Sequence, residues 1–129
     1  MDKEAVRTEA APAPFQGAPY SQAISANGFV FVSGQLALRP DHAEIVGEGI
    51  AEQTEQVFAN LRVILEEAGS GLDRLLKTTV FLTDLGDFAG MNEVYARHVG
   101  DPPPARATIE VSALPSGAKL EIEAIALAG

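Results

Sequence analysis

Two segments with helical periodicity, separated by a segment typical of a strand, constrain the fold of this chain most. Apolar residues recur at helical spacing from about Ile50 to Ala68, and Gly69 follows where a helix would end. Residues 75–83, LLKTTVFLT, are β-branched and aromatic, which favours a strand. A second helical pattern begins near Asp87 and ends at Gly100 and the three prolines after it. This order predicts both helices on one face of a mixed sheet.

The remaining strands are expected on either side of this helical region. Residues 21–25 and 29–34 flank Asn27-Gly28, a pair that tolerates the positive φ angles of a hairpin turn. Residues 105–112 and 119–127 have the composition of two further strands, joined by a turn-rich stretch. The sequence therefore predicts an α+β fold whose sheet is completed by the C-terminal strands.

The length of 129 residues predicts one domain that spans residues 1–129. Residues 1–19, rich in Ala and Pro, are expected to form an arm or a short edge strand, and residues 39–42 a turn. Two helices on one face leave the other face of the sheet open. Because so short a chain offers no third layer, we expect self-association through the open face.

The residues that are scarce or absent exclude several kinds of site. The chain has no cysteine, which excludes disulfides, thiol nucleophiles and thiolate metal ligands. Its two histidines, His42 and His98, lie in different segments, and we assign both structural roles: His42 in a polar turn and His98 near a helix C-terminus, where a cation suits the helix dipole. The sequence therefore does not predict a metal site.

The charge and hydropathy of the chain argue against nucleic acid and membrane partners. The formal net charge is -9, and no cluster of Lys and Arg reverses it locally. No apolar run approaches the roughly 20 residues of a membrane-spanning helix. The first fifteen residues lack the pattern of a signal peptide, so we expect a cytoplasmic protein.

Arg106 is the first candidate for a binding residue. It begins a predicted strand in which Arg106, Thr108 and Glu110 share one face, while the other face is apolar. A guanidinium group offers a planar fork that matches a carboxylate, so Arg106 could anchor a small anionic ligand. It could equally form a structural ion pair with one of the many acidic residues. The sequence alone leaves both interpretations open.

Glu121 is the second candidate, on the last predicted strand. Glu121 and Glu123 begin a face that ends apolar at Ile125 and Leu127, which suggests that at least one of the two carboxylates is partly buried. Burial raises the pKa of a carboxyl group and suits it to proton transfer near neutral pH. Alternatively, residues 119–127 form an edge strand whose charges prevent aggregation. From the residues alone, we favour the edge-strand interpretation.

Hydroxyl groups near the predicted strand ends form a third set. Ser33 comes at the end of its strand, where site residues are common. Tyr20 follows a proline on a turn, where its hydroxyl could orient water or substrate, or its ring could cover the hairpin. Tyr95 is expected to pack inward from the second helix together with Phe88, Met91 and Val99.

Four sequence blocks resemble the YjgF/RidA family of reactive intermediate deaminases. They are GAPYSQA at 17–23, FVSGQ at 31–35, LLKTTVFLTDLGDFAGMNEVY at 75–95 and PARATIEVSALPSGAKLEIEAIA at 104–126. The resemblance implies a chorismate-mutase-like α+β fold, assembled as a homotrimer with sites between subunits. It also implies hydrolysis of 2-aminoacrylate-like enamines and imines, which carry a carboxylate, to 2-keto acids and ammonia without a cofactor.

The resemblance also implies roles for individual residues. Arg106 would bind the substrate carboxylate, and Glu121 would position and activate water. Tyr20 and Ser33 would contribute hydroxyl groups that line the cleft.

Three further residues complete the expected substrate-binding set: Thr108, Asn92 and Gly34. Thr108 departs from the family pattern, because several of the deaminases have cysteine two positions after the arginine. We expect activity to survive this change, since water suffices as the nucleophile. The resemblance leaves three alternatives: an endoribonuclease or translation inhibitor, a small-carboxylate-binding regulatory or chaperone-like trimer, and a deaminase specialised for one catabolic pathway.

Overall fold

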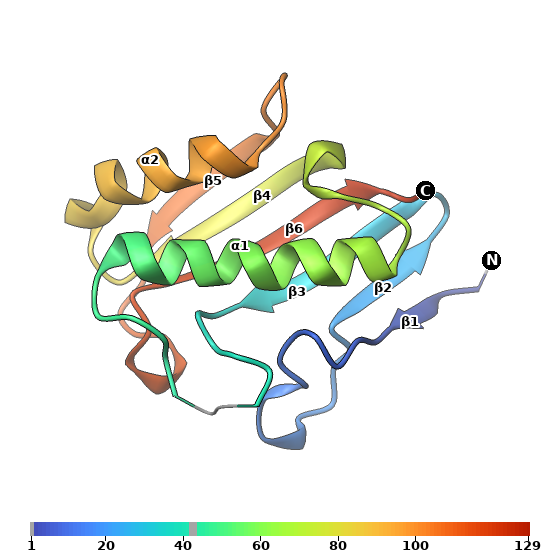
Figure 1. Ribbon diagram of the computed structural model, residues 1–129, viewed down its shortest axis with the longest axis horizontal. Coiled ribbons are helices and arrows are strands. Elements are labelled where there is room, and N and C mark those ends of the chain that lie inside the picture. The colour runs from blue at the N-terminus through green and yellow to red at the C-terminus, as the bar shows by residue number, and fades with distance from the viewer. Residues whose placement is uncertain (1, 42–43) are drawn as a thin grey trace.

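The computed structural model describes residues 2–41 and 44–129, and the predicted role of His42 therefore lies outside the described residues. A six-stranded mixed sheet has the order β1-β2-β3-β6-β4-β5. Helices α1 (Ile50–Glu67) and α2 (Phe88–His98) lie on the same side of it (Figure 1). The strands are β1 (Glu4–Val6), β2 (Ala23–Ala26), β3 (Phe29–Gln35), β4 (Leu75–Leu82), β5 (Ala105–Glu110) and β6 (Leu120–Leu127). The α+β fold with both helices on one face is confirmed.

The last strand lies in the middle of the sheet rather than at its edge. β6 pairs antiparallel with β3 on one side and with β4 on the other. The crossover through α2 places β5 parallel to β4 on the outer side of β4, which leaves the inner side free for β6. The edge-strand interpretation of residues 119–127 is therefore wrong. Charges on β6 cannot guard a sheet edge.

A β-bulge interrupts the pairing of β3 with β6. Val32 pairs with Ala124 and Gln35 pairs with Ile122, so that Ser33 and Gly34 together lie opposite one residue of β6. A bulge of this kind bends its strand and changes the direction of the side chains beside it. The predicted end of the strand at Gly34 is thus a bulge within a strand that ends at Gln35.

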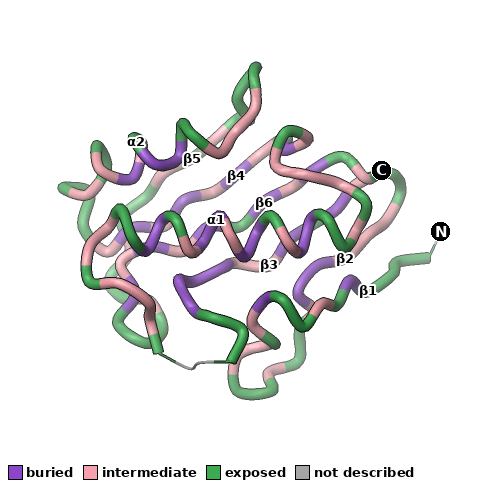
Figure 2. The backbone as a smooth tube through the Cα atoms, viewed as in Figure 1, coloured by how far each residue is buried: buried purple, intermediate pink, exposed green. Residues whose placement is uncertain are grey.

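The hydrophobic core fills the space between the sheet and the two helices. Figure 2 shows buried backbone on the strands and on the sides of α1 and α2 that face them. The largest fully buried side chains are Phe58, Leu61, Ile64, Leu65, Leu82, Met91, Leu120 and Ile122. Burial of one such side chain contributes about 1.5–3 kcal/mol to stability. The other face of the sheet carries exposed apolar side chains, among them Phe31, Ile109 and Leu127.

The ends of the helices lie near the residues predicted from the sequence, but not every contact expected there is formed. Gly69 follows α1 with φ at 78° and donates its N–H to Glu66 O at 3.0 Å, as predicted. Asp87 occupies the N-cap position of α2 but makes no side-chain capping bond. The prediction that Phe88 packs inward is wrong, because its side chain is 42% exposed at the very start of α2.

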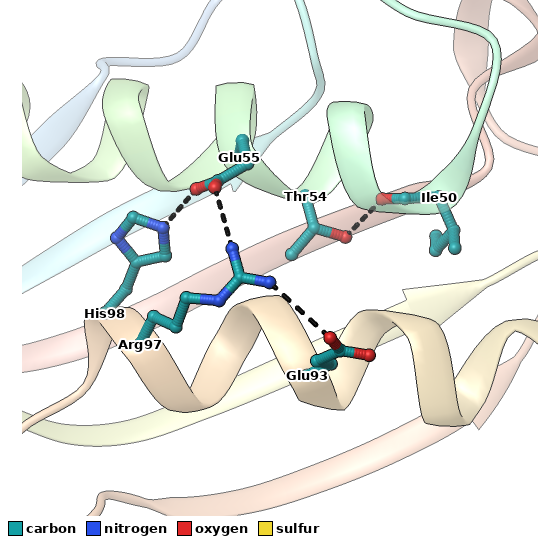
Figure 3. Close-up of polar contacts among 6 residues, drawn as sticks. All are labelled: Ile50, Thr54, Glu55, Glu93, Arg97 and His98. Carbon is teal, nitrogen blue, oxygen red and sulfur yellow. Dashed lines mark hydrogen bonds and ion pairs between the residues drawn. The ribbon is translucent and has the colours of Figure 1, made fainter.

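The two helices are joined by polar contacts at the end of α2. Figure 3 shows Arg97 and His98 both directed toward Glu55 on α1. Arg97 Nη1 lies 3.3 Å from Glu55 Oε2, and His98 Nε2 bonds to Glu55 Oε1. The His98 ring also stacks on Phe58, with centroids 4.8 Å apart. These contacts give His98 a structural role, as predicted.

Candidate functional site

A cavity of about 480 Å³ opens beside the bulge of β3. Residues of β3 and β6 contribute to its lining, together with the segment before β2 and the residues that follow β3. Its lining includes Pro12, Ala13, Phe15, Ala18, Tyr20, Gln22, Ser33, Gly34, Gln35, Leu36, Leu38, Pro115, Glu121 and Glu123. The structure therefore brings together four of the seven predicted residues, namely Tyr20, Ser33, Gly34 and Glu121.

Glu121 lies half-buried on the open face of β6 and is packed against Gly34. A Cβ atom added at Gly34 would lie 2.6 Å from Glu121 Oε2 and 2.7 Å from its Cδ. Only glycine therefore leaves the carboxylate in its present place. Burial raises the pKa of Glu121, and the negative charge of Glu123 on the same face raises that pKa further. A raised pKa brings this carboxyl group closer to the range in which it can take up and return a proton near neutral pH.

The hydrogen bonds of Ser33 and Tyr20 determine what each hydroxyl can offer a ligand. Ser33 Oγ donates its proton to Ser21 O at 2.6 Å, so only its lone pairs face the cavity. Tyr20 Oη accepts the Phe15 N–H at 2.6 Å, which leaves its own proton free to donate. The pair therefore provides one acceptor and one donor.

Arg106 lies outside this cavity, between two aromatic rings. Its Cζ atom is 4.7 Å from the Tyr95 ring centroid and 5.4 Å from that of Phe88, both on α2. Among the described residues, no carboxylate oxygen lies within 4.0 Å of its guanidinium nitrogens. The structural ion pair considered from the sequence is not formed. Cation–π contacts hold the group and leave its donors free of any carboxylate.

Tyr95 is held in turn by a buried hydrogen bond. Its hydroxyl lies 2.6 Å from Thr78 Oγ1, and its ring packs edge-on against Phe58. Burial raises the pKa of Tyr95, while the Thr78 hydrogen bond and the charge of Arg106 act in the opposite direction. The sequence predicted packing for Tyr95 but missed its contact with Arg106. The helical spacing of Phe88, Asn92 and Tyr95 was the available signal, since residues so spaced share a helix face.

Asn92 and Thr108 belong to the same region as Arg106. The side-chain Oδ1 of Asn92 is buried and has no hydrogen-bond partner within the described part of the chain. Such an acceptor costs about 1–3 kcal/mol when it stays unsatisfied, so it favours a ligand or partner that donates to it. Thr108 follows Arg106 by two residues on the same face of β5 and is half-buried.

The two groups of residues lie on opposite faces of the sheet. Arg106 pairs with Thr78 of β4, and Thr78 is fully buried beneath the helices. Glu121 pairs with Phe81, three residues further along β4 and therefore on the other face. One chain thus carries a cavity with Glu121 and a separate cluster with Arg106, and it does not bring the two together.

Over residues 2–41 and 44–129, no group of three or more His, Cys, Asp or Glu side chains is placed to hold a metal ion. No helix in that part of the chain is long and apolar enough to cross a membrane.

The sequence and the fold both match known proteins. Residues 8–128 match the family described as Endoribonuclease L-PSP. The chain is 51% identical to a RutC family protein of Pyrococcus abyssi, over 98% of both chains. It is 50% identical to the chloroplastic Reactive Intermediate Deaminase A of Arabidopsis thaliana, over 98% of this chain and 66% of that protein. The crystal structure of E. coli TdcF with bound serine superposes with a TM-score of 0.88 at 36% identity, over 98% and 99% of the chains.

These similarities establish the class of protein. The chain belongs to the Endoribonuclease L-PSP family, which is the YjgF/RidA family that the sequence blocks resemble. The name of the Arabidopsis relative assigns reactive intermediate deamination to that protein. Because that relative is chloroplastic, the cytoplasmic location stays a prediction.

Proposed function

We propose that this protein hydrolyses small, carboxylate-bearing enamines and imines of the 2-aminoacrylate type to 2-keto acids and ammonia. The observation that carries the proposal is the half-buried Glu121 carboxyl group, whose raised pKa suits proton transfer and whose position depends on Gly34. The bound serine in the TdcF structure supports a small amino-acid-like ligand for a related fold.

A complete site would need two copies of the chain. Arg106 and Glu121 lie on opposite sheet faces. This placement supports a site whose carboxylate anchor and proton carrier come from neighbouring subunits. The exposed apolar side chains on the open face support the association of subunits there. We propose a homotrimer, with Arg106, Thr108 and Asn92 of one subunit completing the cavity of the next.

The reaction follows from the groups that each half provides. Arg106 holds the substrate carboxylate, and Glu121 takes a proton from water as the water oxygen bonds to the imine carbon. The electron pair of the C=N bond moves to nitrogen, and the N–H of that nitrogen donates a hydrogen bond to Ser33 Oγ. The protonated Glu121 then returns its proton to that nitrogen. Glu121 next takes the carbinol proton and passes it to the same nitrogen, so that C=O forms, the C–N bond breaks and ammonia leaves.

Thr108 is compatible with this chemistry. It provides no thiol, and no covalent bond to the protein is required when water is the nucleophile. Tyr20 can donate its free proton to an oxygen of the tetrahedral adduct, since its lone pair is already engaged by the Phe15 N–H.

The description of the family includes an endoribonuclease activity, which is the second candidate function. The formal net charge of -9 disfavours a phosphate backbone as ligand. A regulatory trimer that binds small carboxylates without turnover would use the same Arg106 cluster. Turnover is therefore what separates it from a deaminase.

The test couples a threonine or serine dehydratase to this protein and follows keto-acid release in the presence of semicarbazide, which traps unreacted imine. We expect faster release with the wild type. Arg106→Ala removes a charge-assisted contact of about 2–4 kcal/mol, which lowers kcat/KM about 30- to 1000-fold. Arg97→Ala is the matched control, because Arg97 forms its ion pairs with Glu55 and Glu93 at the surface.

Two outcomes would contradict the proposal. If the wild type releases keto acid no faster than the reaction without it, the deaminase function is wrong. If light scattering gives a mass near the 13.5 kDa of one chain, rather than about three times that value, the shared site is wrong. RNA cleavage that persists in Arg106→Ala after further purification would instead support the endoribonuclease.

A further inference from the structure

The segment before β2 is held in place by one buried side chain. We call residues 8–18 the N-terminal arm. Gln22, only 5% exposed, accepts the Thr8 N–H on Oε1 at 2.8 Å. Its Nε2 group shares two hydrogens among three carbonyl oxygens of the arm: Thr8 O at 3.0 Å, Ala11 O at 3.3 Å and Pro12 O at 2.9 Å. A single carboxamide thus satisfies four backbone groups that lie 10 to 14 residues earlier in the chain.

The same residue is also tied to the strand that carries the bulge. The Ser33 N–H donates to the Gln22 backbone carbonyl at 2.9 Å, and Ser33 Oγ donates to the neighbouring Ser21 O. The Tyr20 hydroxyl holds the arm at a second point through the Phe15 N–H. The position of the arm relative to Ser33 and Glu121 is therefore set through residues 20–22.

The arm forms an apolar wall of the cavity. Pro12, Ala13, Phe15 and Ala18 line it together with Ser33 and Glu121. A ligand whose reacting carbon lies near Glu121 would direct its side chain toward this wall. Neither the proposed chemistry nor the seven predicted residues use it.

We propose that the N-terminal arm is the surface that receives the substrate side chain, and that Gln22 is the positioning residue that keeps this surface in place. The proposal rests on the function proposed above for where the substrate lies. Contact with an ordered apolar wall should tighten binding about fourfold for each methylene added to the ligand side chain. A wall that is no longer fixed loses most of this gain, because it must be ordered again upon binding.

The chemistry of the Gln22 network offers a variant with a distinct signature. In Gln22→Glu, one oxygen can still accept the Thr8 N–H, but the other oxygen faces the carbonyl oxygens that Nε2 served. An ionised carboxylate is repelled there, whereas a protonated carboxyl group can donate one hydrogen bond. Docking of the arm in this variant should therefore improve as the pH falls.

The experiment measures dissociation constants for pyruvate, 2-oxobutanoate and 2-oxopentanoate, which differ by one methylene each, by NMR titration of the intact protein. Binding is used because it does not require turnover. The variants are Gln22→Ala and Gln22→Glu. The matched control is Gln53→Ala, since Gln53 is also buried and bonds to backbone at Gly47 O and Lys119 N, away from the arm. Hydrogen exchange at the Thr8 and Phe15 amides reports on the arm itself.

We expect affinity to rise about fourfold per methylene for the wild type and Gln53→Ala. For Gln22→Ala, and for Gln22→Glu at pH 8, we expect affinity to rise less than about twofold per methylene, with faster hydrogen exchange at the Thr8 amide. In Gln22→Glu, the gain in affinity per methylene should return toward the wild-type value as the pH falls to 5.

The inference is overturned if the wild type shows no dependence on side-chain length. It is also overturned if the dependence persists in both Gln22 variants at pH 8, or disappears equally in Gln53→Ala. If Gln22→Ala does not fold, the pH response of Gln22→Glu decides. Keto-acid binding with the expected slope, but without acceleration of imine hydrolysis, would refute the proposed function and leave the inference standing.

Discussion

The contact between Gly34 and Glu121 leads to a prediction in which activity and stability separate. A Cβ at position 34 would lie 2.6 Å from Glu121 Oε2, whereas ordinary contact begins near 3.4 Å. Gly34 is not in the left-handed region, so alanine fits its backbone without strain. Because the atom in the way is the end of a flexible side chain, we expect Gly34→Ala to fold and to displace the carboxylate by about 0.8 Å.

The displacement sets the size of the effect. Misplacing a reacting group by about 1 Å can cost about 100-fold in rate, so we expect kcat of Gly34→Ala to fall about 30- to 100-fold. Replacing glycine by alanine within a strand recovers about 0.5–1 kcal/mol of backbone entropy, which offsets the cost of moving the side chain. The free energy of unfolding should therefore stay within about 1 kcal/mol of the wild type.

The assay combines the dehydratase-coupled reaction with urea denaturation. Gly49→Ala is the control, because a Cβ there meets only Glu52 Oε1 at 3.7 Å. As Gly49 is the N-cap of α1, this variant should lose about 0.5–1 kcal/mol of stability and keep its activity. In Glu121→Gln, adding Gly34→Ala should change kcat little, since both changes act through one side chain.

Three results would refute this reasoning. Gly34→Ala with at least half of the wild-type kcat would show that the place of the carboxylate does not matter. A variant that fails to fold would show that the side chain cannot move aside. Full additivity in the double variant would point to an effect that does not pass through Glu121.

Four further predictions concern single residues of the site. Burial and, to a lesser extent, the charge of Glu123 raise the pKa of Glu121, so the acid limb of the pH profile of kcat/KM should move to lower pH in Glu123→Gln. The stability contributed by protonated Glu121 is lost as the pH rises through its raised pKa. Glu121→Gln should therefore increase Tm at pH 8 and change Tm little at pH 4. Tyr95→Phe keeps the ring beneath Arg106 but loses the Thr78 bond, and steady-state kinetics should show KM raised about three- to tenfold with kcat nearly unchanged. Thr108→Cys should keep kcat/KM within about threefold and add sensitivity to thiol reagents, whereas a gain of more than about tenfold would indicate a role for the thiol.

The fold could be predicted from the sequence because its helices and strands have clear periodicities. The spacing from Ile50 to Ala68, the stop at Gly69 and the Asn27-Gly28 turn all depend on neighbouring residues. The central place of β6 depends instead on which strand edge the α2 crossover leaves free. The order of strands is a long-range property of the fold. When only the local sequence is considered, two glutamates in the last strand suggest a strand at the edge of the sheet.

The candidate site shows the same limit. The residue types at positions 106 and 121 suggested the chemistry of Arg106 and Glu121. Alternation along each strand, however, could not show whether the two side chains lie on the same face of the sheet or on opposite faces. The bulge at Ser33 and Gly34 had a sequence signal, since glycine within a strand pattern often marks one. The direction of the Ser33 and Tyr20 hydroxyl protons had none, because it depends on the carbonyl of Ser21 and the amide of Phe15.

Those two hydroxyl groups limit how protons can move in the proposed reaction. Imine hydrolysis removes both protons of the attacking water, one after the other, and delivers both to nitrogen. Ser33 cannot deliver a proton while its own is held by Ser21 O, and the proton of Tyr20 would leave a phenolate with only the Phe15 N–H to stabilise it. Glu121 can do both in turn, because a raised pKa makes its carboxylate a stronger base and keeps its acid form accessible. One carboxyl group that cycles between two states, kept in place by the absence of a side chain at Gly34, is sufficient for both transfers.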